Sequence, residues 1–128
     1  MKNRQEEINL LNIQLITSLI VIVTVTISLI LTYNQKLDLQ NKKTIFTKKQ
    51  THNISYINRL TILITTSIFL FINYKLYLIS KKEGEDLLVY YLQITASILS
   101  TIAALIVFYV VTRETTGDEI SDIENPVI

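Results

Sequence analysis

Among the carboxamide side chains in the apolar stretches of the sequence, three stand out, namely those of Gln14, Asn73 and Gln93. A primary amide both donates and accepts hydrogen bonds, and hydrocarbon offers it no partner. The chemistry open to these residues is therefore hydrogen bonding. They can bond to one another and fix the register of packed helices, which is the interpretation we favour, or they can line a polar vestibule or ligand pocket.

Residues capable of stronger chemistry are scarce. The chain has no cysteine, and its one histidine, His52, has no second histidine and no nearby pair of carboxylates to complete a set of metal ligands. No nucleophile–base arrangement, phosphate-binding loop or nucleic-acid-binding pattern is present in the sequence. We therefore expect no catalytic activity, no cofactor, no metal ion and no nucleic-acid partner.

Long uncharged segments indicate which elements carry the three amides. Residues 8–35 and residues 87–112 contain no formal charge, and each segment exceeds the roughly 20 residues that a helix needs to cross a bilayer. A third uncharged segment, 60–74, is shorter. Arg59 and Lys75 flank it, and such long basic side chains can extend to the membrane interface. Three transmembrane helices are therefore predicted, with the lipid bilayer as their surroundings.

The predicted fold is all-α: an integral membrane three-helix transmembrane bundle with a disordered acidic tail. The bundle comprises residues 1–112, with spans at about 8–33, 54–80 and 87–112 and a basic loop at 34–53. All seven tyrosines lie near the ends of these spans, where an aromatic ring with a polar tip is most favourable. Residues 113–128 are rich in acids and form the flexible tail.

Two stripes of small and polar residues predict how the helices pack. Helices in a bilayer associate by close packing and interhelical hydrogen bonds, which small residues allow. The third span places small residues four apart, at Ala96, Ser100 and Ala104. The first span has residues three and four apart that are typical of a left-handed helix pair, at Gln14, Thr17, Val21, Thr24 and Ser28. We expect both stripes to pack inside the bundle, and the alternative for the third span is a self-association face.

Charge is distributed unevenly along the chain. The loop at 34–53 carries five lysines and one acid, so its end of the bundle is expected in the cytoplasm, together with the C-terminus, with the N-terminus outside. Contacts with lipid headgroups are expected from Lys42, Lys43, Lys48, Lys49 and Arg59. The enrichment in Ile, Lys and Asn, with little Ala and Pro, favours a bacterial plasma membrane.

The function class predicted by these features is a small polytopic membrane protein that acts as a non-catalytic interaction or accessory subunit. Its partner is a second copy, in a homo-oligomer, or a larger membrane protein. The alternative is a pore-forming protein. Three short spans with the N-terminus outside resemble a phage holin of the three-span type, and the resemblance implies pore formation. Such holins tend to end in a basic tail, whereas this chain ends in an acidic one.

Overall fold

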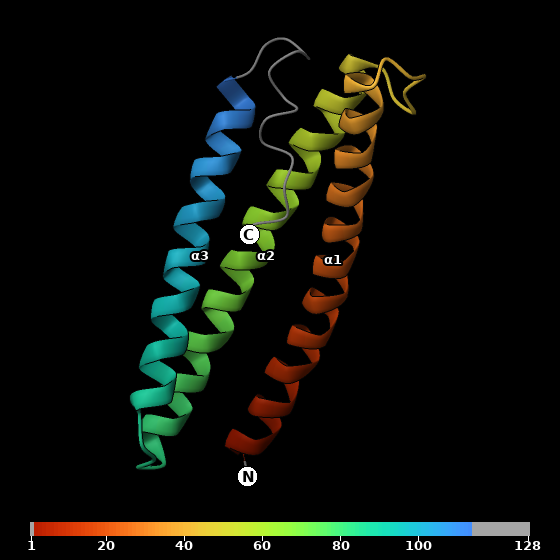
Figure 1. Cartoon of the computed structure of the whole chain (residues 1–128). Coiled ribbons are helices and arrows are strands. Elements are labelled where there is room, and N and C mark those ends of the chain that lie inside the picture. The colour runs from red at the N-terminus through yellow and green to blue at the C-terminus, as the bar shows by residue number, and fades with distance from the viewer. Residues whose placement is uncertain (1, 114–128) are drawn as a thin grey trace.

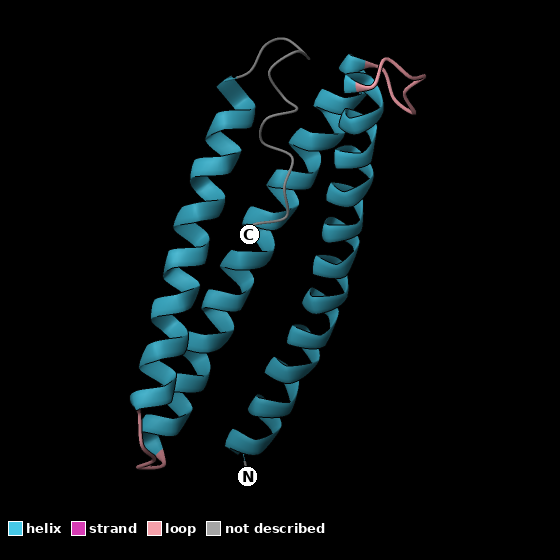
Figure 2. Cartoon of the chain, viewed as in Figure 1, coloured by secondary structure: helices cyan, strands magenta, loops and turns pink. Residues whose placement is uncertain are grey.

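Three long helices make up the protein. A computed structural model describes residues 2–113, and within this range the helices are α1 (Lys2–Leu39), α2 (Lys48–Lys82) and α3 (Leu88–Arg113). Figure 2 shows that the parts between the helices are short loops. Each helix is long and apolar enough to cross a membrane, and the prediction of an all-helical fold with three such helices is confirmed. The predicted acidic tail, apart from Arg113, lies outside the described residues.

The central helix of the arrangement is α2. It packs against both α1 and α3, whereas α1 and α3 make no comparable contact with each other (Figure 1). Successive helices run in opposite directions, so the loop after α1 and the end of α3 lie at one end of the molecule. We call this the loop end and the opposite end, with the turn between α2 and α3, the hairpin end. The bundle is therefore open along one side of α2.

The contacts with α2 follow a seven-residue repeat on both outer helices. On α1 the repeat is made of side chains between 1 % and 5 % exposed, Leu10, Thr17, Thr24 and Leu31. On α3 it is made of side chains between 0 % and 9 % exposed, Ser97, Ala104 and Val111. Seven residues are close to two helical turns, and a repeat of this length is typical of left-handed packing.

The two helices that are followed by another helix, α1 and α2, end in the same way. Asn41 has a φ of 56°, and the amides of Asn41 and Lys42 donate to the carbonyls of Asp38 and Leu37. Gly84 has a φ of 72°, and the chain after α2 makes the equivalent pair of bonds to Lys81 and Ser80. This is the Schellman motif, in which a residue in the left-handed region stops the helix and bonds its last carbonyls.

The helices extend beyond the apolar spans that the charge pattern predicts. The first helix continues to Leu39 and the second begins at Lys48, so the connection between them is 40–47 rather than the expected 34–53. The start of α2 is set by a capping box in which Thr47 and Gln50 bond each other's backbone amides. The positions of charged residues predict only the part of a helix that is apolar. The ends of the helix itself are set by the capping residues, which lie beyond that part.

Candidate functional site

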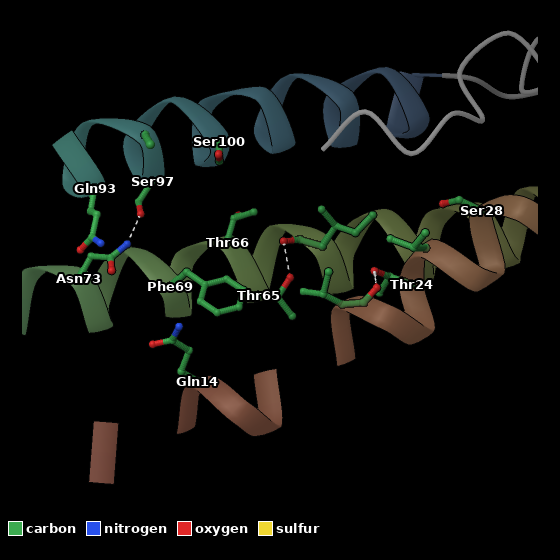
Figure 3. Close-up of a pocket in the computed structure, with 14 residues that line it drawn as sticks. Gln14, Thr24, Ser28, Thr65, Thr66, Phe69, Asn73, Gln93, Ser97 and Ser100 are labelled. Carbon is green, nitrogen blue, oxygen red and sulfur yellow. Dashed lines mark hydrogen bonds between the residues drawn. The ribbon is translucent and has the colours of Figure 1, made fainter. Parts of the chain in front are cut away.

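A cavity of about 380 Å³ lies along the open side of α2 and is lined by all three helices. We call it the groove. Its lining consists of uncharged side chains, most of them polar: Gln14, Val21, Thr24, Val25, Ser28, Ile62, Thr65, Thr66, Phe69, Asn73, Gln93, Ala96, Ser97 and Ser100. Figure 3 shows these side chains projecting toward one another from the three helices. The groove therefore suits uncharged groups that form hydrogen bonds.

The three amides singled out in the sequence all line the groove, but they do not bond to one another. Nδ2 of Asn73 donates to Oγ of Ser97 and so joins α2 to α3. Gln93 lies beside this pair, and Gln14 faces it from α1 (Figure 3). Within residues 4–113, no hydrogen bond is made by the amide of Gln14 or of Gln93. These two amides are therefore available to a group from outside the described chain.

The threonines of the groove bond back to their own helices. The hydroxyls of Thr24, Thr65 and Thr66 donate to main-chain carbonyls three residues earlier, at oxygen–oxygen distances of 2.7, 2.9 and 2.9 Å. Each hydroxyl proton is thus already used, and only oxygen lone pairs remain for other partners. Unlike these hydroxyls, the amides of Gln14 and Gln93 keep both donors and acceptors for new hydrogen bonds in the groove.

The two predicted packing stripes have different positions. On α1, Thr17, Thr24 and Ser28 are buried, and Gln14 and Val21 are half-buried at the edge of the groove. On α3, Ala104 is buried, in the seven-residue repeat that faces α2. Ala96 and Ser100 are exposed and line the groove instead. Their small side chains leave space beside α2 and do not bring two helices into contact.

A buried asparagine joins α1 to α2. Nδ2 of Asn58 lies 3.2 Å from the carbonyl oxygen of Thr24 and 3.1 Å from Oγ of Ser28, and donates to both. The side chain is 2 % exposed. Because an unbonded amide N–H group is costly to bury, these two bonds from Nδ2 favour this register of α1 on α2. The equivalent link between α2 and α3 is the bond from Asn73 to Ser97.

Asn34 holds the loop after α1, a role that the sequence does not reveal. Its Oδ1 accepts hydrogen bonds from the main-chain amides of Ile45 and Phe46, at 2.8 and 3.0 Å. The residue was expected in a loop, but it lies inside α1 and is buried. Ile45 and Phe46 follow Asn34 by 11 and 12 residues, so these bonds depend on the path of the loop between them. No spacing pattern in the sequence predicts that path.

The residues expected to contact lipid headgroups fall into two groups. Lys42, Lys43, Lys48 and Lys49 are exposed at the loop end. Arg59, in contrast, is 2 % exposed in α2, which is not the surface position that we expected for it. It follows Asn58 on the face of α2 that is turned into the bundle, and a side chain on that face is covered by its neighbours. Headgroup contact stays a prediction for the four lysines.

Comparison with known proteins gives no relative: no family model matches the chain, and neither does any curated protein or solved structure. Among the described residues there is no group of three or more His, Asp or Glu side chains that could hold a metal ion. The groove and the loop held by Asn34 are the features of the described residues that bear on function.

Proposed function

We propose that the protein is a non-catalytic interaction or accessory subunit of a membrane assembly, with all three helices crossing the bilayer. The observation that supports this is the pair of amides of Gln14 and Gln93, which line an open groove and have no partner among the described residues. Leaving such an amide unbonded in an apolar medium costs about 1–3 kcal/mol. A helix that covers the groove and bonds these amides removes that cost.

The small side chains that line the groove suit a partner helix, because they let its backbone approach closely. Ala96 and Ser100 are small and exposed, and small side chains four residues apart let a second backbone approach closely. The partner helix then lies over α2, between α1 and α3, and occupies the side on which the bundle is open. The partner is a second copy of the chain or a larger membrane protein.

The proposed location is a bacterial plasma membrane, with the loop end in the cytoplasm and the N-terminus outside. Lysines concentrate in 34–53, and the positive-inside rule assigns such a loop to the cytoplasmic side. Arg113 lies at the same end of the molecule, at the end of α3.

Crosslinking inside the membrane tests the proposal. The chain has no native cysteine, so Ser100→Cys places a single thiol in the groove. Leu99→Cys is the matched control, because Leu99 is exposed but lies outside the groove lining. We expect oxidation to give a discrete crosslinked product, through Ser100→Cys and not through Leu99→Cys. If the protein forms a homo-oligomer, the crosslinked product is a dimer of the chain. If the partner is a larger membrane protein, the crosslinked product forms when a single-cysteine variant of that partner is co-expressed.

Two results would contradict the interaction proposal. The first is equal crosslinking through both positions, which indicates random collision. The second is a rapid loss of membrane potential when the protein is produced, which favours the pore. One observation favours that second function: the groove lining extends along α1 from Gln14 to Ser28 and includes the polar residues Gln14, Thr24 and Ser28, over a length of about 21 Å at 1.5 Å per residue. Such a surface could form one wall of an aqueous path in an oligomer.

A further inference from the structure

The loop of residues 40–47 folds back along α1 instead of extending away from the helix ends. Oδ1 of Asn34 bonds the main-chain amides of Ile45 and Phe46, and Nδ2 of Asn34 lies 3.4 Å from Oγ1 of Thr51 in α2. The Asn34 side chain is buried. It thereby fastens the loop to both helices.

This fastening sets the depth of the loop tip. Asn34 lies five residues before Leu39, where α1 ends, and five residues correspond to about 7–8 Å of helix. The main-chain amides of Ile45 and Phe46 are thus held beside α1 near the level of Asn34 and its neighbour Tyr33, more than one helical turn before the end of α1. Figure 1 shows the loop projecting sideways from α1 on the side away from α3, with its tip bent back toward the hairpin end. In a bilayer, a loop in this position lies over the lipids that surround the bundle.

Further bonds order the loop from within. The Schellman motif at Asn41 fixes its first residues, and the capping box at Thr47 fixes its last. Between them, Oγ1 of Thr44 donates to the carbonyl oxygen of Phe46 at 3.0 Å. The tip therefore has one defined conformation, and the side chains that it exposes have defined positions.

The exposed side chains of the loop combine an apolar tip with positive charge. Ile45 is 55 % exposed. Lys42 and Lys43 in the same loop, and Lys49 in the first turn of α2, are exposed as well. Tyr33, a residue type favoured at the membrane interface, is exposed at the same level of α1. A loop that exposes an apolar side chain and lysines at this level matches the boundary between acyl chains and anionic headgroups.

From this geometry we infer that residues 40–47 form a binding site for anionic phospholipids, in which Asn34 is the positioning residue. Ile45 enters the boundary of the acyl chains, and Lys42 and Lys43 bind the phosphate groups. An acidic protein segment would also attract the lysines. It would not account for an exposed isoleucine fixed below the end of α1, so lipid is the partner that fits both features.

The experiment uses Ile45→Trp in the full chain, which has no native tryptophan. We call the introduced side chain the loop tryptophan. The protein is reconstituted in vesicles that mix phosphatidylcholine with phosphatidylglycerol, and one of the two lipids carries bromine on its acyl chains. We expect brominated lipid to quench the loop tryptophan strongly, and we expect brominated phosphatidylglycerol to quench it severalfold more than the same fraction of brominated phosphatidylcholine. The double variant Lys42→Gln, Lys43→Gln should lose this preference.

The role of Asn34 is tested in the same background. Asn34→Ala should shift the emission of the loop tryptophan to longer wavelength, reduce quenching by lipid and increase quenching by aqueous acrylamide. Asn53→Ala is the matched control, because Asn53 is exposed and near the same loop, and it should leave the emission unchanged. A separate reporter, Tyr109→Trp on the exposed face of α3, should be unaffected by Asn34→Ala, which shows that the bundle remains inserted.

Three results would overturn the inference. A loop tryptophan accessible to acrylamide and not to brominated lipid means that the loop lies in water. Equal quenching by the two brominated lipids means that the lysines do not select anionic lipid. A preference that arises only after residues 114–128 are removed means that the acidic tail, and not lipid, occupies the lysines in the intact chain.

Discussion

At the scale of the residue, asparagine has three separate structural roles in this protein. Asn58 joins α1 to α2, Asn73 joins α2 to α3, and Asn34 fastens a loop. In each case a short amide donates or accepts at a position where an apolar side chain would contribute no bond. Asn41 adds a fourth use, because asparagine tolerates the left-handed backbone that ends α1.

Removal of the Asn58 amide should weaken the contact between α1 and α2. Asn58→Ala deletes the bonds to Thr24 and Ser28 and leaves a small cavity, for an expected loss of about 1–2 kcal/mol in the free energy of unfolding. Reversible unfolding in mixtures of mild detergent and SDS measures this loss. Asn53→Ala, at an exposed position, serves as the control, and equal stability of the two variants would mean that the buried bonds contribute nothing.

Glycine should be needed at position 84 because it adopts a positive φ without strain, and not because a larger side chain would lack space. Its φ is +72°, and a Cβ built at this position meets no atom within 4 Å. Gly84→Ala should therefore destabilise the protein through backbone strain alone, by about 1–2 kcal/mol. The same unfolding measurement checks the value. Asn41→Gly places glycine in the corresponding turn after α1 and should be neutral or slightly stabilising, so a destabilised Asn41→Gly protein would argue against this account.

At the scale of the element, the seam between helices follows every seventh residue. A helix surface offers rows of residues three, four and seven apart, and the sequence alone does not choose among them. The small residues of α3 suggested the row of four, Ala96, Ser100 and Ala104. In the structure Ala104 is buried with Ser97 and Val111. Ala96 and Ser100 lie to one side, where they give the groove its width.

Two alanine substitutions distinguish these rows. Ala104→Leu adds volume in the contact with α2, where Ala104 is 2 % exposed, and should cost about 1–3 kcal/mol in the free energy of unfolding. Ala96→Leu adds the same volume in the groove and should change stability by less than about 0.5 kcal/mol, while it blocks the crosslink through Ser100→Cys. If Ala96→Leu proved the more destabilising of the two, the row of four would be the true seam.

Some features of this fold can be predicted from the sequence and others cannot, and the difference lies in the kind of interaction. The three helices were predictable because the absence of charge over 8–35 and 87–112 is a property of composition. The amides of Gln14, Asn73 and Gln93 could be placed near one another because antiparallel spans of known length set their depth. The bond from Asn73 to Ser97 and the bonds of Asn34 could not be predicted, since they depend on helix rotation and on the path of one loop.

At the scale of the whole molecule, the antiparallel arrangement puts the lysines of the loop end, such as Lys42 and Lys43, and the turn at Gly84 on opposite sides of the proposed membrane. This orientation is testable because the chain has no cysteine. In intact cells, a maleimide that does not cross membranes should label Glu85→Cys at once and Lys43→Cys after permeabilisation. The reverse pattern would place the loop end outside, and with it the proposed lipid site.

The bonding of the α1 hydroxyls has a consequence for the order in which the helices meet during synthesis. Thr17 and Thr24 each donate to a carbonyl of α1 itself, so these hydroxyl protons would already be bonded if α1 stood alone in the proposed membrane. Asn58 has no such local solution, because both of its bonds are made to α1. If α2 enters the proposed membrane after α1, the amide of Asn58 therefore finds its acceptors already in place.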